Sequence, residues 1–327
     1  MSTESSGKRI ALVLGAGGAR GLAHIGVIEV LREHGHEIVA VAGSSMGALV
    51  GGIYAAGRLE EYTRWASALE RSDVVRLLDF AFGHPGLFKG DRVIGVLREL
   101  IGSYQIESLP IPFTAVATDV QRQREVWLQR GPLFDAIRAS IAIPMVFTPH
   151  GINGRELVDG GLLSPMPMAA TRMSAADWVV AVDLNAHMHP AENGMPSPVT
   201  AVEKAQAGDD APQNDSLRQR ISGFLDGFIE KRNKPAASQP GIVDLMSQAL
   251  DTMQAQIARM QLALDPPDLL VRVPHDACAF YEFWRAKELI EIGRHAAEHA
   301  LAALARQNDD GDMSARRKPS AQGNASS

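Results

Sequence analysis

Apolar residues follow two different periodicities along the first two hundred positions of the chain. Short runs rich in β-branched residues predict strands, and stretches with apolar residues three or four positions apart predict helices. The strands are expected at residues 10–14, 38–42, 113–118, 126–129, 157–158 and 178–184. Because strands alternate with helical segments, the pattern favours an α/β fold with a mostly parallel central sheet.

The helical segments between these strands carry apolar stripes. The first stripe consists of Leu22, Ile25, Ile28 and Leu31, and Gly35 ends that helix. A second helix is expected to open at Asp91 as its N-cap and to bury Val93, Ile94, Leu97 and Leu100. Residues 38–57 are uncharged over a length that could span a bilayer, but small residues and a central turn favour a buried strand followed by a buried helix.

The second half of the chain predicts a change in organisation at residue 187. We expect a flexible N-terminus at 1–9, a core at 10–186, exposed loops at 187–241, C-terminal helices and a strand at 242–305, and a disordered tail at 306–327. The loops enclose an amphipathic helix at 217–229, which could pack on the core, act as a lid or lie on a membrane surface.

The C-terminal segment is expected to hold a long helix, a strand at 269–273 and a helix at 279–304. The long helix carries Met246, Met253 and Met260 on one stripe, for which core packing is the default and an acyl pocket the alternative.

Composition limits the classes of function. Hydrophobic residues make up 46% and charged residues 21% of the 327 residues, a balance typical of globular proteins. A net charge of -6 gives no basic face, so no nucleic-acid partner is expected. The lone Cys278 is interpreted as a buried structural thiol. We expect no signal peptide and no transmembrane helix, and hence a cytoplasmic location, with peripheral contact at the inner membrane surface left open.

The segment VAVAGSSMGAL contains Gly43-Ser44-Ser45-Met46-Gly47 between a predicted strand and a predicted helix. This is the G-x-S-x-G pattern in the context that it requires, since a nucleophilic serine projects from a sharp strand-to-helix turn. Gly43 and Gly47 are expected because a Cβ at either position would collide with the backbone of the turn. Ser45 is therefore the candidate nucleophile, and a helix N-cap is the structural alternative.

A glycine loop follows the first strand, in the order Gly15-Ala16-Gly17-Gly18-Ala19-Arg20-Gly21. Amide groups of such a loop at a helix N-terminus can hold a phosphate or the oxyanion of an acyl intermediate. A dinucleotide fingerprint needs a small residue where Arg20 stands, and the Walker A ending is absent. We therefore expect an oxyanion hole formed by the amides of Gly17, Gly18 and Ala19. Arg20 could attract an anionic head group or form a salt bridge that steadies the loop.

The serine needs a base, and two kinds of residue compete for that role. Asp159 follows the strand 157–158 and precedes Gly160 and Gly161, which allow a sharp turn. Its alternative is an Asx-turn, in which the carboxylate binds its own backbone. Among the ten histidines, His187 and His189 follow a predicted strand end and are the competing candidates.

Four segments together resemble the patatin-like phospholipase family, in order and in spacing. AGGARG at 16–21 resembles its oxyanion loop, GSSMG at 43–47 its nucleophile elbow, and VDGGLL at 158–163 its catalytic-aspartate turn. ASIAIP at 139–144 is similar to another recurring family segment. The resemblance covers residues 10 to about 184.

This resemblance implies a three-layer α/β/α patatin-like fold with a helical C-terminal extension. It also implies a catalytic dyad of Ser45 as nucleophile and Asp159 as general base, a lipid ester as substrate, and neither a metal nor another cofactor. Two alternatives stay open: a Ser-His-Asp esterase or thioesterase, and a lipid-binding or regulatory protein that uses the same fold without turnover.

Overall fold

The computed structural model describes residues 7–81, 86–186 and 242–316. The chain divides into two compact units, one formed by Met1–His187 with Gln254–Ser327 and the other by Met188–Met253. Of the second unit, only the beginning of helix α8 lies within the described residues. The amphipathic helix expected at 217–229, and the histidines at 187 and 189, lie outside them.

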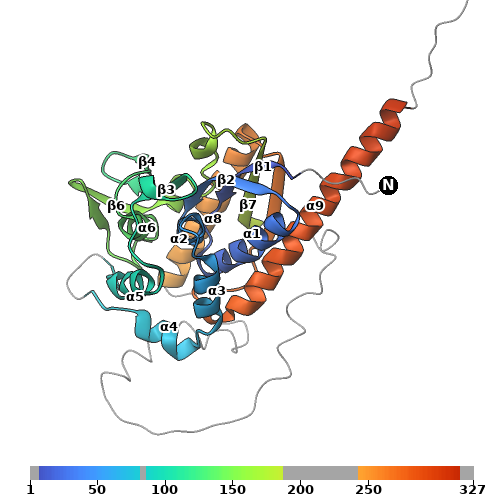
Figure 1. The fold of residues 1–327 in the computed structure, drawn as a ribbon. Helices are drawn as coiled ribbons and strands as arrows, with labels where there is room; N and C mark the ends of the chain where they lie inside the picture. Colours follow the sequence, from blue (N-terminus) through green and yellow to red (C-terminus); the bar gives the residue numbers. More distant parts are fainter. Residues whose placement is uncertain (1–6, 82–85, 187–241, 317–327) are drawn as a thin grey trace, which may run out of the picture. The chain divides into compact units, whose positions relative to one another are not determined.

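The first unit is built on an eight-stranded sheet with the order β5-β6-β3-β2-β1-β7-β8, in which β4 also pairs with β3 (Figure 1). Neighbouring strands from β3 to β8 along this order run parallel, and β4, β5 and β6 are antiparallel additions at one side. The strands are β1 Arg9–Leu14, β2 Glu37–Ser44, β3 Phe113–Asp119, β4 Arg124–Leu128, β5 His150–Ile152, β6 Arg155–Asp159, β7 Trp178–Ala186 and β8 Leu269–Pro274.

Helices flank both faces of this sheet, which confirms the predicted three-layer α/β/α fold. The α-helices are α1 Ala23–Glu33, α2 Met46–Ala55, α3 Leu59–Ser67, α4 Arg71–Leu77, α5 Asp91–Ile101, α6 Leu133–Ser140, α8 Ile242–Leu264 and α9 Ala286–Arg316. The 3-10 helices are η1 Gly18–Leu22, η2 Ile106–Ser108, η3 Gly160–Leu162, η4 Met168–Thr171 and η8 Phe283–Arg285. Among the described residues, no helix is both apolar enough and long enough to cross a membrane.

Strand β1 shows how the two faces are covered. Leu12 and Leu14 point into the main core, which includes α1, α2 and α9, whereas Val13 points into a smaller core on the opposite face. There Val13 packs with Met166 and with Ala258 of α8. This alternation is what a strand buried on both sides requires, because successive side chains point to opposite faces of a sheet.

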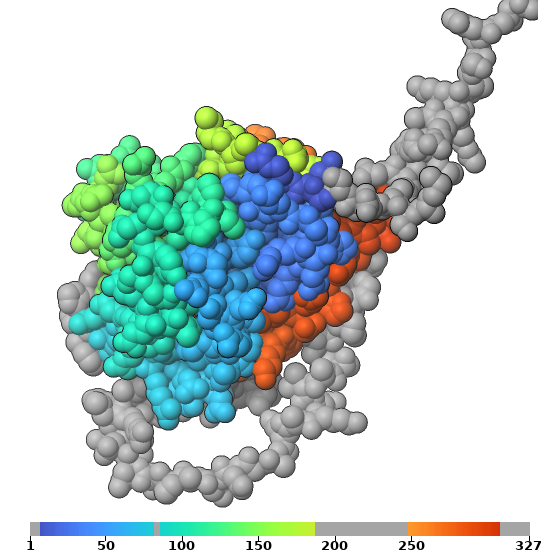
Figure 2. Space-filling view, in the orientation of Figure 1, coloured from blue at the N-terminus to red at the C-terminus, as the bar shows by residue number. Residues whose placement is uncertain are grey.

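Helix α9 packs along α1, although the two are separated by more than 250 positions in the sequence. Figure 2 shows the C-terminal helix, in red, directly against the blue N-terminal residues. Arg294 of α9 contacts two carboxylates of α1, those of Glu29 at 3.0 Å and Glu33 at 2.6 Å. The C-terminal extension is therefore part of the unit that contains the sheet.

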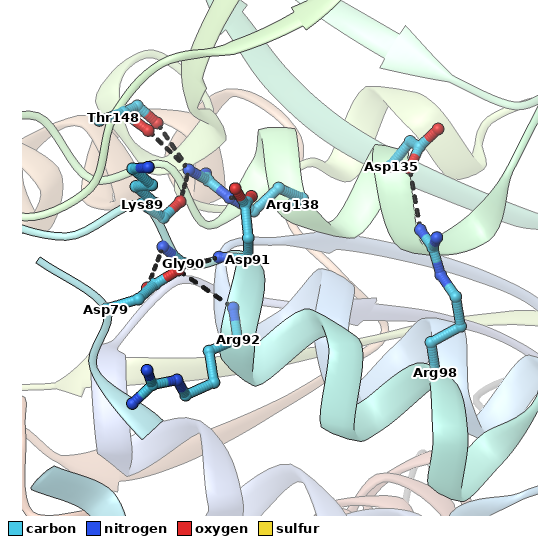
Figure 3. Close-up of polar contacts among 9 residues, drawn as sticks. All are labelled: Asp79, Lys89, Gly90, Asp91, Arg92, Arg98, Asp135, Arg138 and Thr148. Carbon is cyan, nitrogen blue, oxygen red and sulfur yellow. Dashed lines mark hydrogen bonds and ion pairs between the residues drawn. The ribbon is translucent and has the colours of Figure 1, made fainter. Parts of the chain in front are cut away.

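Helix α5 begins at Asp91 as predicted, but Asp91 is not its N-cap. The cap residue is Gly90, and the capping carboxylate comes from Asp79, which accepts from the amides of Gly90, Asp91 and Arg92 at 2.7, 3.0 and 3.1 Å (Figure 3). Leu100 is 36% exposed rather than buried. The sequence could not indicate this cap, because the carboxylate approaches from twelve positions upstream.

A buried arginine ties α6 to the segment before α5. Arg138 is 2% exposed, and its guanidinium donates from Nη2 to the carbonyl oxygens of Lys89 and Thr148 (Figure 3). Its Nε lies 3.7 Å from a carboxylate oxygen of Asp91, and burial lowers the pKa of the Arg138 side chain. The contact joins α6 to the N-terminus of α5.

The C-terminal helices differ from the prediction in three respects. Helix α9 starts at Ala286 instead of residue 279, and it continues to Arg316, through part of the tail expected to be disordered. Continuation needs no apolar stripe, because each added residue of an existing helix gains one backbone hydrogen bond. In α8, Met253 and Met260 are 52% and 56% exposed, and the small side chains of Ala255 and Ala258 are buried instead. Core packing of Met253 and Met260 was therefore a wrong prediction, and the side chain of Met246 lies outside the described part of the chain.

Candidate active site

Ser45 occupies a strained turn between β2 and α2. Its φ of 55° and ψ of -124° lie outside the regions that ordinary residues prefer. A Cβ on Gly43 would lie 2.3 Å from the Gly47 carbonyl group, and one on Gly47 would lie 2.0 Å from the Leu14 oxygen. The prediction that both flanking positions need glycine is confirmed. Ser45 is the N-cap residue of α2 by position, but its hydroxyl makes no capping hydrogen bond to the helix.

The Ser45 hydroxyl instead donates to Asp159. The distance from Oγ to Oδ2 is 2.6 Å, and the two residues are 4% and 2% exposed. Asp159 ends β6, which pairs with β3, and β3 in turn lies beside β2. The other oxygen of Asp159 accepts from the Gly161 amide at 2.7 Å. In the sequence analysis, the Asx-turn and the partnership with serine were alternatives for Asp159. The carboxylate makes both contacts, one through each oxygen.

The environment of Asp159 changes its acidity. Burial raises the pKa of the carboxyl from an ordinary value of 3.8 to about 7, while the hydrogen bonds from Ser45 and Gly161 oppose that rise. The largest cause is the loss of water around the charged form. A carboxylate with this pKa is a much stronger base at neutral pH than an exposed aspartate.

The backbone of Ser45 is held by a residue to which the sequence assigned no role. The Ser45 amide donates to Ser140 Oγ at 3.0 Å, and Ser140 Oγ donates to the carbonyl of Val116 at 2.6 Å. The Asp159 amide donates to the carbonyl of Ala142 at 2.9 Å. Both contacts come from ASIAIP, so the recurrence of this segment was the available signal. One short segment holds the backbones of both members of the pair.

The glycine loop lies beside these two turns. A Cβ on Gly21 would lie 2.3 Å from the Met46 Cβ, and one on Gly161 would lie 2.9 Å from the Ala16 Cβ. Since β1 and β2 are parallel and pair Leu14 with Gly43, the loop and the serine turn meet at the carboxyl edge of the sheet. Ala16 is not at positive φ, so its methyl group is tolerated.

The amides of the loop are not equivalent. The Ala19 amide donates to the carbonyl of Phe280 at 2.8 Å, which corrects its expected place in an oxyanion hole. The sequence could not indicate this contact, because Phe280 is far along the chain. Within the described residues, the amides of Gly17 and Gly18 have no hydrogen-bond acceptor. Gly18 has a φ of 54°, and a Cβ there would lie 2.7 Å from the Phe280 oxygen.

Arg20 and His24 bind the carbonyl side of the loop. Arg20 is 5% exposed and donates from Nε to the Gly17 oxygen at 3.1 Å and from Nη1 to the His275 oxygen at 2.5 Å. These two hydrogen bonds to backbone carbonyls hold the loop in place. His24 lies 2.9 Å from the Gly15 oxygen, and burial lowers its pKa to about 4. His24 is therefore a neutral core histidine at pH 7.

Neither Ser45 nor Asp159 is hydrogen-bonded to a histidine in the described part of the chain. That part also holds no group of three histidine, cysteine or acidic residues that could bind a metal ion. Cys278 is buried and unpaired, as predicted, and burial raises the pKa of its thiol to about 12.

A serine on a strained strand-to-helix turn, with a buried carboxylate within hydrogen-bond distance on a three-layer α/β/α fold, is an arrangement that serine hydrolases use. The model of the patatin-like phospholipase family matches residues 12–172. An uncharacterized NTE family protein of Mycobacterium tuberculosis is 41% identical over 94% of this chain and 95% of its own length. The chain therefore belongs to the patatin-like phospholipase family, as its sequence motifs suggested.

More distant relatives are much longer proteins. Lysophospholipase NTE1 of Debaryomyces hansenii is 26% identical over 90% of this chain but only 18% of its own length. Patatin-like phospholipase domain-containing protein 6 of Mus musculus is 32% identical over 55% of this chain and 14% of its own length. The crystal structure of VipD from Legionella pneumophila has a TM-score of 0.42 and 13% identity, covering 91% of this chain and 67% of that chain.

Proposed function

We propose that the protein is a lipid acyl hydrolase that cleaves acyl esters of phospholipids or lysophospholipids. Ser45 is the nucleophile and Asp159 the general base. The observation that carries this proposal is the 2.6 Å hydrogen bond from Ser45 Oγ to Asp159 Oδ2 in a buried site. Membership of the patatin-like phospholipase family and the name of the lysophospholipase relative support the lipid substrate.

The first half of the reaction forms an acyl-enzyme. Ser45 Oγ attacks the ester carbonyl carbon while its proton passes to Asp159 Oδ2, and the carbonyl oxygen becomes an oxyanion. When the tetrahedral intermediate collapses, the ester C–O bond breaks and the leaving alcohol takes the proton from Asp159. A pKa near 7 suits both steps, because the same carboxyl must accept a proton and then donate it.

The second half releases the fatty acid. Water gives a proton to Asp159 as it attacks the acyl carbon, and the proton returns to Ser45 Oγ when the acyl–serine bond breaks. No other base is needed, because the carboxyl ends the cycle deprotonated. Exclusion of water from the closed pair keeps the pKa of Asp159 raised between turnovers.

The amides of Gly17 and Gly18 stabilise the oxyanion in both halves. They lie in the loop beside the serine turn and have no acceptor within the described residues. Helix α2 begins at Met46, directly after the nucleophile, so the positive end of its dipole adds to the field at the reacting carbonyl. Loss of one oxyanion donor typically costs ~10²- to 10³-fold in rate.

The substrate would be drawn from a lipid surface, so we include peripheral membrane contact in the proposal. Leu163, four positions after Asp159, is 38% exposed, and an apolar side chain at this place suits contact with acyl chains.

Labelling with a fluorophosphonate probe and peptide mapping tests the nucleophile without a known substrate. We expect modification at Ser45, and loss of both labelling and fatty-acid release from lysophospholipid micelles in Ser45→Ala and Asp159→Asn. His187→Ala and His189→Ala should retain activity. Full activity in Asp159→Asn, or loss in either histidine variant, would replace the dyad with a histidine-dependent mechanism. An unlabelled wild-type protein that still binds lipid would point to a non-catalytic member of the fold.

A further inference from the structure

Three consecutive peptide carbonyls of the glycine loop are each held by a buried side chain. The contacts are His24 Nε2 with Gly15 O at 2.9 Å, Asn185 Nδ2 with Ala16 O at 3.0 Å and Arg20 Nε with Gly17 O at 3.1 Å. A buried carbonyl needs a donor, so these contacts satisfy the loop. They also fix the direction in which each peptide plane faces.

That direction decides where the amides point. In a trans peptide the C=O of one residue and the N–H of the next point in opposite directions, and the described residues contain no cis peptide. The amide that follows Gly15 O belongs to Ala16 and is used by the Pro165 oxygen at 3.0 Å. The amide that follows Ala16 O belongs to Gly17, and it has no acceptor in the described part of the chain.

We propose that Asn185 is a positioning residue for the oxyanion hole: by holding Ala16 O, it keeps the Gly17 N–H turned toward the reacting carbonyl. The inference rests on the proposed ester hydrolysis at Ser45. Asn185 itself touches no substrate atom. It acts through the Ala16–Gly17 peptide, which a glycine on one side would otherwise leave easy to rotate.

Asn185 is itself well fixed for this role. It lies near the end of β7, which pairs with β1 directly before the loop, and it is 7% exposed. Its backbone amide donates to Asp183 Oδ1 at 2.9 Å. Because Ala16 O can only accept a hydrogen bond, the atom of the Asn185 carboxamide that faces it must be the NH₂ group. A carboxylate of the same shape would repel that carbonyl.

Two substitutions separate this role from simple packing. Asn185→Asp keeps the shape and replaces the donor with an acceptor, and Asn185→Ala removes the side chain without adding a charge beside Asp183. If Asn185→Asp does not fold, Asn185→Ala is used to test the proposal. Thr171→Val is the matched control, because it removes a buried hydrogen bond to a backbone carbonyl, from Thr171 Oγ1 to Met168 O at 2.9 Å, in η4 and not in the glycine loop.

The assays compare hydrolysis of a chromogenic acyl ester with inhibition by an acyl trifluoromethyl ketone, which forms a tetrahedral oxyanion adduct with a nucleophilic serine. We expect kcat to fall roughly 10²-fold in the Asn185 variants, approaching the loss of one oxyanion donor, with KM within about twofold of wild type. The affinity for the ketone should fall by the same factor as kcat/KM. Thr171→Val should keep wild-type kcat and ketone affinity.

The proposal is overturned if a folded Asn185 variant keeps kcat within about twofold of wild type, if only KM changes, or if ketone affinity is unaltered. An equal loss of kcat in Thr171→Val would also overturn it, since any lost buried hydrogen bond would then have the same effect. These results differ from failure of the proposed function itself. In that case the wild-type protein would hydrolyse no ester, or Ser45→Ala would hydrolyse it as fast as wild type.

Discussion

The raised pKa of Asp159 makes a prediction about stability as well as catalysis. The folded protein holds the Asp159 proton up to about pH 7, whereas the unfolded chain releases it near 3.8. The contribution of this carboxyl to stability is therefore fully present below about pH 4 and is lost as the pH rises to about 7. Replacement by asparagine, which is neutral at every pH, should remove that loss.

The magnitude follows from linkage. Each unit of difference in pKa corresponds to about 1.4 kcal/mol, so the wild-type protein loses roughly 4 kcal/mol between about pH 4 and 7 through this one group. Asp159→Asn should therefore gain in free energy of unfolding relative to wild type by about 1.4 kcal/mol per pH unit over that interval. Above about pH 7.5 the difference should stay constant. Asparagine keeps the acceptor oxygen that the Gly161 amide uses, so the turn is preserved.

Urea unfolding, followed by tryptophan fluorescence at half-unit steps from pH 5 to 8.5, measures this difference directly. All other titrating groups are shared by the two proteins and cancel. Ser45→Ala provides the control, because it keeps the buried carboxyl: its stability should still fall as the pH rises from 5 to 7, and the fall should continue to higher pH than in wild type, since loss of the serine hydrogen bond raises the pKa of Asp159 further. The same Asp159→Asn protein should lose ester hydrolysis by roughly 10²- to 10⁴-fold, the usual contribution of a general base. A difference in unfolding free energy that does not change between pH 5 and 7 would refute the raised pKa.

Three further measurements address the base, its backbone support and the cap of α5. The wild-type kcat/KM should rise about tenfold per pH unit below about pH 7 and level off above it, since Asp159 must be deprotonated to act; a flat profile from pH 5 to 8 contradicts this. Ser140→Ala should slow fluorophosphonate labelling of Ser45 by roughly tenfold or more, because the Ser45 amide loses its acceptor, whereas an unchanged labelling rate would make Ser140 dispensable. Asp79→Ala should lower the free energy of unfolding by ~1 kcal/mol in urea, and a change below a few tenths would mean that water replaces the cap.

Much of the fold could be predicted because the local pattern of apolar residues matches the strands and helices that form. The strand at 10–14 and the uncharged segment from 38 are observed as β1 and β2, followed by helix α2. Short strand β5 was missed, since three residues carry too little periodicity to stand out. The start of α9 was placed seven residues too early, because the segment before it makes long-range contacts, among them Phe280 O with the Ala19 amide.

The same distinction divides the candidate site. Turn glycines and the order of serine and aspartate leave a local trace in the sequence, because only certain residues can occupy such turns. The direction in which a peptide plane faces leaves no such trace in the sequence. Ala19 and Gly17 look alike in the loop, yet a carbonyl from position 280 uses the amide of Ala19, and no acceptor in the described chain uses that of Gly17.

The support of the site comes from elements that are distant in sequence from the turns that they hold. Ser140, the last residue of helix α6, holds the serine turn after β2, while Asn185, near the end of β7, holds the loop after β1. Strand β7 lies beside β1, and Ser140 also donates to the carbonyl of Val116 in β3, the strand beside β2. A strained turn and a buried carboxyl both reduce stability on their own. They persist here because the surrounding side chains satisfy the backbone groups that the turns expose, so the chemistry of the site depends on the packing of the whole sheet edge and not on the two reacting residues alone.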